Sequence, residues 1–251
     1  MNASDPSQKP GSACPADPSA DLTIAALKKE LEFSKKKLEL VGSVTRHDVL
    51  NQLTAIIGFN ELLRMMVQDP KLKNYVEKEK LAIDRIRVQF QYAKDYQNIA
   101  VDPPRWQNVR NLVGLASENC MNKSVQVLTD TGDAAILADP LLDKAIHYLF
   151  EDALCEGEKV TQVQVSLILT GTNGVLIMEN NGAGIPAEEK GRIFDRGYGR
   201  TGSWGLFLAR EILVITGMTI AENGDPDRGV RFEITLPPGT LQLNVGDPSD
   251  L

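Results

Sequence analysis

Histidine and cysteine are scarce in this chain. Its 251 residues include two histidines, His47 and His147, and three cysteines, Cys14, Cys120 and Cys155. The cysteines are odd in number and show no paired spacing, which argues against a disulfide framework and against a cysteine zinc site. They are typical of reduced thiols in the cytoplasm.

The sequence also lacks a long apolar run and an excess of basic residues. No stretch approaches the ~18 consecutive apolar residues of a membrane span. The N-terminus shows no basic-then-apolar signal-peptide pattern. A net charge of −7 argues against a nucleic-acid-binding protein, which would present a basic face. Because 42% of the residues are hydrophobic and 24% are charged, we expect an ordinary soluble, cytoplasmic protein.

A polar cluster at residues 45–54, Thr-Arg-His-Asp-Val-Leu-Asn-Gln-Leu-Thr, lies within an otherwise apolar-periodic helix. His47 and Asn51 are four residues apart and share a helical face, and Asp48 directly follows the histidine. A neutral imidazole is a good nucleophile toward phosphorus when one of its nitrogens is free. The alternative for Asp48 and Asn51 is a solvated helix face, which the adjacent histidine disfavours.

Residues 21–100 predict two long amphipathic helices joined by a short turn. Apolar residues before the polar cluster alternate in steps of three and four, with Ser34 filling one position, and form a short coiled-coil seam: Ile24, Leu27, Leu31, Leu38 and Val41. Pro70 ends the first helix, and a second helix is expected from about residue 73 to residue 99. One helical hairpin cannot bury its apolar faces, so we expect a parallel homodimer with a four-helix bundle.

The rest of the chain has a different composition or rhythm. Residues 1–20 are rich in Pro, Ser, Ala, Gly and Asp, which predicts a disordered tail. After a stiff break at 101–104, residues 105–238 alternate short strands and helices, which predicts an α/β sandwich with one mixed sheet and helices on one face. A short helix is expected to end near Phe194, and residues 239–251 are expected to form a loose tail.

Five motifs follow one another in a distinctive order. They are the histidine box, Ala138-Asp-Pro-Leu-Leu142, Asn180-Asn-Gly-Ala-Gly-Ile-Pro186, Arg192-Ile-Phe-Asp-Arg-Gly-Tyr-Gly199 and Gly205-Leu-Phe-Leu-Ala-Arg-Glu-Ile212. From about residue 40 to residue 238, this series resembles the sensor histidine kinases of two-component signal transduction. The last two motifs resemble a short-lid branch often seen in archaea. The resemblance implies an α+β chain, in which a helical hairpin forms a dimeric four-helix bundle and a GHKL (Bergerat) α/β sandwich ATPase domain follows.

The resemblance implies a protein-histidine kinase that uses ATP and Mg²⁺. His47 would be phosphorylated, Asp48 would orient or deprotonate its ring, and Asn51 would act in dephosphorylation. The phosphoryl group would pass to an aspartate of a response-regulator receiver domain. Asp152 stands at the family's metal-binding asparagine, and Asn180 at the aspartate that accepts a hydrogen bond from the adenine amino group.

The resemblance also places a set of backbone and loop positions around the nucleotide. Glycines there let the backbone approach the ligand, and the helix after the lid offers N–H groups to phosphate. The positions are Gly182, Gly184, Ile185, Gly199, Gly202, Ser203, Gly205 and Leu206.

Three positions depart from the family pattern. Asp152 is a good Mg²⁺ ligand but adds negative charge beside the triphosphate. Asn180 keeps a carbonyl acceptor for adenine but loses the charge-assisted bond. Ser203 adds a Cβ where the short-lid branch has glycine. The departures support an alternative function, a dimeric histidine phosphotransfer or scaffold protein with a degenerate domain that binds no ATP. A third interpretation, an unrelated α/β domain whose glycine loops are turns, is disfavoured by the order of the motifs.

Overall fold

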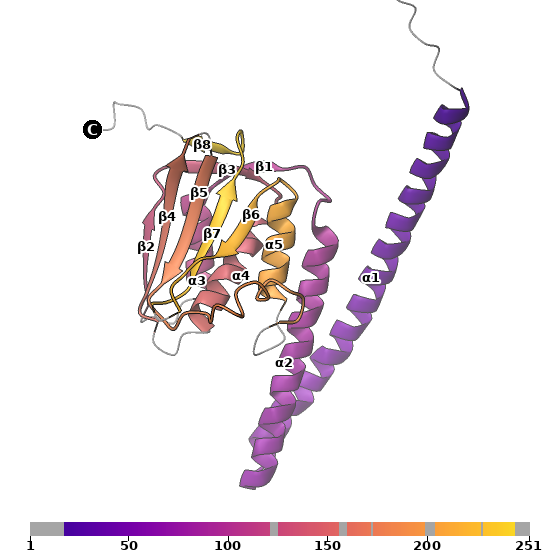
Figure 1. Cartoon of the computed structure of the whole chain (residues 1–251). Helices are drawn as coiled ribbons and strands as arrows, with labels where there is room; N and C mark the ends of the chain where they lie inside the picture. The colour runs from indigo at the N-terminus through magenta and orange to yellow at the C-terminus, as the bar shows by residue number, and fades with distance from the viewer. Residues whose placement is uncertain are drawn as a thin grey trace, which may run out of the picture. The chain divides into compact units, whose positions relative to one another are not determined.

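The computed structural model describes residues 18–120, 125–155, 160–171, 173–198, 204–226 and 228–243. The chain forms two units, residues 1–58 and 59–251. Most of the first unit is a single long helix, α1 (Pro18–Met66), whose last turns belong to the second unit (Figure 1). The predicted tail at residues 1–20 therefore overlaps the helix at its end, and residues 1–17 lie outside the described residues.

The coiled-coil seam lies on α1 as predicted, and its apolar side chains face solvent. Those of Ile24, Leu27, Leu31 and Leu38 are between 50% and 70% exposed. The side chain of Val41 lies outside the description. A 49-residue helix with an uncovered apolar stripe needs another surface to cover it.

The helical break predicted near Pro70 is confirmed. Asp69 precedes α2 (Pro70–Asn98), and its Oδ1 accepts hydrogen bonds from the backbone N of Lys71 at 2.7 Å and of Leu72 at 3.2 Å. This is an N-cap with proline at the first turn, where the missing N–H has no cost. The buried Asn60 then joins the two helices, since its Nδ2 donates to the carbonyl oxygen of Val76 at 3.0 Å.

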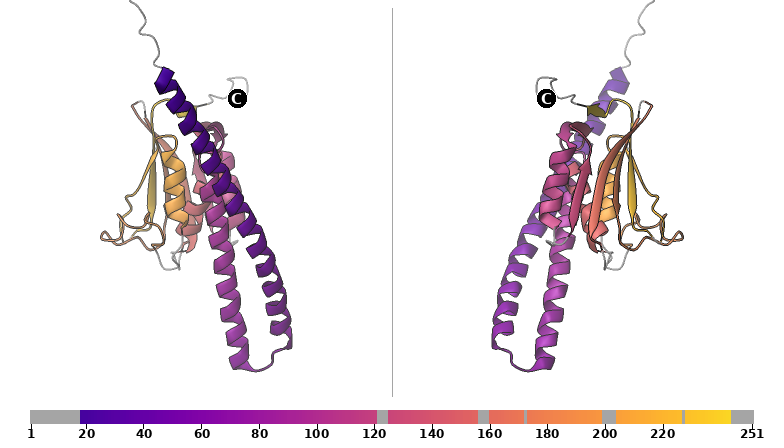
Figure 2. Two further views of the ribbon diagram at one scale, coloured as in Figure 1. Left: turned by 90° about the vertical axis from the view of Figure 1, so that its right-hand side faces the viewer. Right: turned by 90° about the vertical axis from the view of Figure 1, so that its left-hand side faces the viewer.

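Three helices cover one face of a mixed five-stranded sheet in the remainder of the second unit (Figures 1 and 2). The strand order is β2-β4-β5-β7-β6; β2 and β4 are parallel, and the other neighbours are antiparallel. The helices are α3 (Val109–Cys120), α4 (Leu142–Cys155) and α5 (Gly205–Val214). The strands are β2 (Gln126–Asp130), β4 (Gln162–Thr170), β5 (Asn173–Asn180), β6 (Thr219–Glu222) and β7 (Arg231–Leu236).

The core lies between this sheet and its helices. Most of its largest fully buried side chains come from α4, α5, β5 and β7, and they include Phe150, Leu149, Leu208, Ile212, Phe232 and Ile234. Alternate residues of β7 are buried, as expected for strands packed on one face. The predicted α/β sandwich, with helices on one face of a mixed sheet, is thus confirmed.

Two details of the predicted sandwich are wrong. A second, antiparallel sheet exists, formed by β1 (Arg105–Asn108), β3 (Ala134–Ala138) and β8 (Leu241–Leu243) in the order β1-β3-β8. β8 lies in the segment predicted to be a loose tail, of which residues 244–251 are outside the described part. Strands of three or four residues are too short to show a periodic pattern, and their partner is distant in sequence.

The short helix predicted before Phe194 is also absent. Residues 187–194 form successive turns, in which the backbone N of Arg192 donates to Glu189 O at 2.8 Å and that of Asp195 to Arg192 O at 2.8 Å. Ile193 and Phe194 are nevertheless buried in the core. The structure therefore buries this apolar pair without forming the predicted helix.

Candidate functional site

The imidazole of His47 is displayed at the surface of α1. Its side chain is 73% exposed, and Nδ1 lies 3.1 Å from Oδ1 of Asp48. A carboxylate oxygen only accepts hydrogen bonds, so this contact places the proton of the neutral ring on Nδ1. Nε2 then carries the in-plane lone pair, as a nucleophile requires.

Asn51 lies over the face of the same ring. Its Nδ2 is 3.3 Å from Nδ1 and 3.4 Å from Nε2 of His47. An amide nitrogen so nearly equidistant from both ring nitrogens cannot lie in the ring plane without overlapping ring carbons. Asn51 therefore leaves the in-plane direction of the Nε2 lone pair open. The structure brings together the three residues predicted for the histidine box.

The second group of predicted residues gathers where the end of α4 meets the end of β5. The side chain of Asn180 is buried, and its Nδ2 donates to the carbonyl oxygen of Ala153 at 2.5 Å. Its Oδ1 accepts from the backbone N of Gly182 at 3.1 Å and of Val230 at 2.9 Å. Asp152, which immediately precedes Ala153, is therefore close in the chain to the residue that Asn180 binds.

These contacts correct one expectation about Asn180. A carbonyl oxygen has two lone pairs, and both are used here by backbone N–H groups. The predicted free acceptor for an adenine amino group is therefore not present in the structure. The amide is not interchangeable with its flipped form, since a flip would set Nδ2 against two N–H donors and Oδ1 against Ala153 O.

The loop between β6 and β7 packs closely on this position. The backbone N of Gly184 donates to Pro226 O at 3.0 Å, and a Cβ on Gly184 would overlap the backbone of Asp225 and Pro226. Gly229 has φ +111° and lies against Asn180, where a Cβ would overlap its backbone oxygen. Only glycine combines that conformation with that approach.

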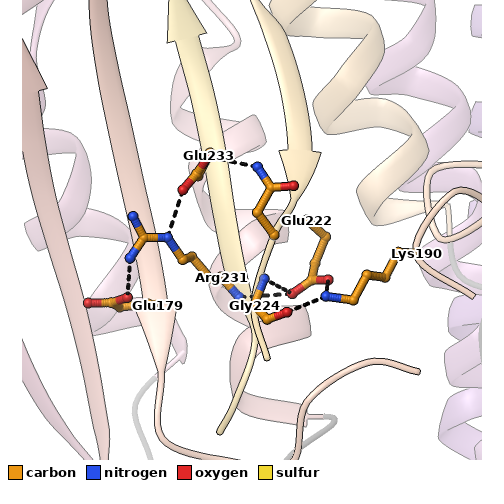
Figure 3. Close-up of polar contacts among 7 residues, drawn as sticks. Glu179, Lys190, Glu222, Gly224, Arg231 and Glu233 are labelled. Carbon is orange, nitrogen blue, oxygen red and sulfur yellow. Dashed lines mark hydrogen bonds and ion pairs between the residues drawn. The ribbon is translucent and has the colours of Figure 1, made fainter. Parts of the chain in front are cut away.

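A charged network holds the same loop in place (Figure 3). The fully buried carboxylate of Glu222 is 2.7 Å from Nζ of Lys190 and accepts from the backbone N of Gly224 at 2.9 Å and of Arg231 at 3.1 Å. Lys190 Nζ also donates to Gly224 O. An ion pair with these additional hydrogen bonds satisfies the buried carboxylate and fixes the loop beside Asn180.

Arg231 extends the network across the sheet (Figure 3). Its guanidinium donates to Glu233 at 2.7 Å through Nε and to Glu179 at 2.9 Å through Nη1. Hydrogen bonds from Arg231 and then from Asn223 hold the pKa of the Glu233 carboxyl below its ordinary value. The bonds to Glu233 and Glu179 raise the pKa of Arg231, so the group is charged throughout the physiological range.

The structure describes only part of the predicted lid, the loop that contains Gly199, Gly202 and Ser203 and precedes α5. Gly205 and Leu206 begin α5 and are buried, and Trp204 makes no side-chain hydrogen bond that would cap the helix. The guanidinium carbon of Arg196 lies 4.2 Å from the centroid of the Trp204 ring, a cation–π contact. The remaining lid candidates, Gly199, Gly202 and Ser203, lie outside the described residues.

Asp152 is the one predicted metal ligand. Within the described ranges, no group of three or more His, Cys, Asp or Glu residues is arranged to hold a metal ion. Mg²⁺ commonly takes one or two carboxylates and completes its shell with phosphates and water. Asp152, partly buried on α4, fits an ion that arrives with a triphosphate, and does not by itself form a cage.

Sequence reasoning missed a contact that joins α2 to α4. Asp95 is buried on α2 and accepts a hydrogen bond from Oη of Tyr148 at 2.5 Å and from Nε2 of Gln91 at 2.8 Å. The rings of Tyr92 and Tyr148 meet edge to face with centroids 5.4 Å apart. In the sequence, Asp95 is one aspartate among the polar positions of an amphipathic helix, and such an aspartate is ordinarily solvated.

Two further contacts extend this junction. Tyr96 lies 6.0 Å from Phe207 of α5, measured between ring centroids. The backbone N of Ala100, a residue with φ +60°, donates to Oδ2 of Asp139 at 2.8 Å. The second histidine, His147, lies on α4 and its side chain is 25% exposed, with Nε2 3.5 Å from Oε1 of Glu151.

Comparisons with known proteins agree with this fold. Residues 130–240 match the family described as histidine kinase-, DNA gyrase B-, and HSP90-like ATPase. Alginate biosynthesis sensor protein KinB of Pseudomonas aeruginosa is 33% identical over 102 residues, which are 38% of this chain and 17% of that protein. The chain thus matches less than a fifth of the length of this curated relative.

Two solved structures have a similar fold over a larger share of the chain. Full-length ShkA in complex with AMPPNP covers 79% of this chain and 46% of its own, with 16% identity and a TM-score of 0.54. The Acinetobacter baumannii histidine kinase AdeS covers 76% of this chain and 97% of its own, with 15% identity and a TM-score of 0.52. Residues 130–240 therefore form a histidine kinase-, DNA gyrase B-, and HSP90-like ATPase domain, and a larger share of the chain has the fold of two solved structures.

Proposed function

We propose that the chain is a protein-histidine kinase that phosphorylates its own His47. The observation that carries the proposal is an exposed imidazole, with Nδ1 bound to Asp48 and the Nε2 lone pair open, in the same chain as a GHKL ATPase domain. The phosphoryl donor is a magnesium nucleoside triphosphate, and the resemblance names ATP.

Transfer of the phosphoryl group to His47 forms one bond and breaks another. The Nε2 lone pair of His47 attacks the γ-phosphorus, and the bond from this phosphorus to the bridging oxygen breaks. The nucleoside diphosphate leaves with that electron pair. The ring loses its Nδ1 proton to Asp48, 3.1 Å away, so that the phosphorylated imidazole ends neutral.

The domain supplies the donor through three groups of residues. Asn180 would contact the base, the backbone of Gly182 to Ile185 would approach it closely, and the N-terminus of α5 at Gly205 and Leu206 would offer N–H groups to the phosphates. A Mg²⁺ ion held by Asp152 and by phosphate oxygens would neutralise charge on the triphosphate.

The proposal includes two partners. A second copy of the chain would cover the exposed seam of α1 and complete a four-helix bundle. A receiver domain of a response regulator would take the phosphoryl group from His47 onto an aspartate, and Asn51 would assist dephosphorylation. Among the residues that the structure describes, no helix combines the length and the apolar character needed to cross a bilayer.

Incubation with nucleotides labelled in the γ-phosphate tests the proposal. The wild-type chain should acquire an acid-labile, alkali-stable label, and His47→Ala should acquire none. His147→Gln is the matched control, because the chain has only these two histidines, and it should keep the label. A label that persists in His47→Ala, or none with any nucleotide and Mg²⁺ or Mn²⁺, would contradict the proposal.

The saturated oxygen of Asn180 supports a second candidate function. The chain would then be a dimeric phosphotransfer or scaffold protein that binds no nucleotide and receives its phosphoryl group at His47 from a phosphorylated receiver. Transfer from a phosphorylated receiver domain to His47, together with no binding of any nucleoside triphosphate, would support it. Micromolar affinity for a nucleoside triphosphate would rule it out.

A further inference from the structure

The apolar seam of α1 follows a heptad repeat, so the positions that flank it can be assigned. The two core positions of the repeat, a and d, are taken in turn by Ile24, Leu27, Leu31, Ser34, Leu38 and Val41. Positions e and g lie along the two edges of such a seam. In a parallel pair of helices, position g of one helix faces position e of the following heptad of the other.

The edges of the seam carry opposite charges where two copies would meet. Glu30 lies at position g, and Lys35 lies at position e of the following heptad. Both side chains are exposed, and neither forms an ion pair with another residue in the described part of the chain. In a parallel pair aligned without a shift, Glu30 of each copy faces Lys35 of the other. The two-fold symmetry of the pair makes this contact twice.

Other alignments of the same helices bring like charges together. A shift by one heptad would set Lys37, which is also at position g, against Lys35 of the second copy. Without the shift, Lys37 faces the uncharged Gly42. In an antiparallel pair, position e faces position e, so the edge that carries Lys28 and Lys35 would meet its own copy. Opposed like charges destabilise a pairing, and both alternatives are therefore disfavoured.

The polar residue within the seam favours the same alignment. Ser34 is the one polar side chain among the core positions of the seam. Without a shift, the two copies of Ser34 face each other, and one hydroxyl can donate to the other. A shift by one heptad would bury a Ser34 hydroxyl against Leu27, where it has no partner. A polar residue at one core position is a common determinant of register in coiled coils.

We propose that Glu30 and Lys35 form the recognition edge through which α1 pairs with a second copy of this chain, parallel and without a shift. The inference rests on the proposed function for the dimer itself and adds what selects its alignment. The apolar seam supplies the affinity, and the two charges select the partner and the register. Aligned in this way, the pair carries its two His47 residues at the same height.

Charge reversals in the full chain test the recognition edge. Glu30→Lys and Lys35→Glu should each weaken self-association at least about fivefold, because two attractive contacts in the dimer become repulsive. The combined variant restores opposite charges and should associate within about twofold of the wild type. Sedimentation equilibrium without nucleotide measures each affinity.

Glu32→Lys and Lys36→Glu are the matched controls. They make the same changes of charge at positions b and f, away from the seam, and should also associate within about twofold of the wild type. Stronger association of Lys35→Glu would indicate an antiparallel pair and would overturn the proposal. Equal losses in the recognition-edge variants and the controls would overturn it as well.

A mixture of the two single variants tests the alignment without reference to affinity. Glu30→Lys has only lysines at the two positions and Lys35→Glu only glutamates, so each repels itself and attracts the other. With one variant labelled with ¹⁵N, native mass spectrometry should show more than about 80% heterodimer. Labelled and unlabelled wild-type chains should reach the statistical mixture under the same conditions, which confirms exchange. A statistical mixture of the variants would overturn the proposal.

Failure of the proposed kinase gives a different result. His47 would then acquire no label from any nucleotide, while the pairing, measured without nucleotide, would be unchanged. A wild-type chain that stays monomeric would overturn the recognition edge, whatever the labelling of His47 shows.

Discussion

The reactivity of His47 depends on which of its two nitrogens is occupied by a neighbour. Asp48 holds Nδ1, while Asn51 lies over the ring face without occupying either lone-pair direction. The two neighbours should therefore contribute unequally to phosphorylation, although they look equivalent in the sequence motif.

Asp48→Asn should slow phosphorylation of His47 by about 10²–10⁴-fold, because an amide cannot take up the Nδ1 proton during transfer. The initial rate of label incorporation measures the effect. Asn51→Ala is the comparison and should slow incorporation by less than about tenfold, since the Nε2 lone pair does not depend on it. Equal losses in both variants would remove the assigned role of Asp48.

How far the site could be predicted differs between its two halves. The histidine box is local in sequence: helical periodicity placed Asn51 on the face of His47, and the family resemblance implied that Asp48 acts on the ring. The resemblance marks Asn180 as a departure from the family pattern, but the bonding state of its amide depends on Val230, which lies 50 residues away. Such a contact has no signature in a single sequence, and the expectation of a free acceptor was therefore wrong.

At the scale of elements, α2 packs against α4 and α5 through a buried hydrogen bond and two aromatic contacts. Asp95 and Tyr148 are both buried, so the hydrogen bond between them pairs two polar groups that have little access to water. Tyr148 is four residues before Asp152 on α4, and the junction therefore lies one helical turn from the predicted metal position.

Tyr148→Phe should lower the free energy of unfolding by about 1–3 kcal/mol, because it leaves a buried carboxyl of Asp95 without its hydroxyl donor. Urea denaturation at neutral pH measures the loss. Tyr75→Phe is the control, since the side chain of Tyr75 is 64% exposed, and it should change stability by no more than about 0.5 kcal/mol. A loss as small as the control's would mean that the bond contributes nothing to stability.

The same hydrogen bond predicts that the stability of the fold depends on pH in the alkaline range. Burial, and then the hydrogen bond to Asp95, raise the pKa of Tyr148 above its ordinary value of about 10. The unfolded chain consequently loses this proton first as pH rises. The stabilisation by Tyr148 should be complete below about pH 10 and should decline above it, so the difference between wild type and Tyr148→Phe should narrow there.

Elements with strong periodicity were predicted well, and short ones were not. The two long helices carry clear patterns, and they lie close to their predicted bounds. β1 and β8 have four and three residues, and both exist because β3 supplies their hydrogen bonds. The segment 187–194 has helical composition but forms turns, since packing of Ile193 and Phe194 decided its conformation.

At the scale of the whole molecule, the exposed seam of α1 predicts assembly. Leu27→Lys combined with Leu31→Lys should weaken self-association at least about tenfold, because each leucine buried at an interface contributes about 1.5–3 kcal/mol. Light scattering over a concentration series measures it. Leu40→Lys is the matched control: Leu40 is also exposed but lies off the seam, and the variant should associate as the wild type does. A monomeric wild-type chain at micromolar concentration would contradict the predicted dimer.

Phosphorus–nitrogen coupling in the phosphorylated chain shows directly which histidine, and which of its ring nitrogens, carries the phosphoryl group. With ¹⁵N-labelled histidine, the spectrum contains only His47 and His147. After reaction with a magnesium nucleoside triphosphate, we expect ³¹P coupling to Nε2 of His47, because Asp48 holds Nδ1. Coupling to Nδ1 of His47, phosphorus on His147, or no phosphorylated histidine would contradict it.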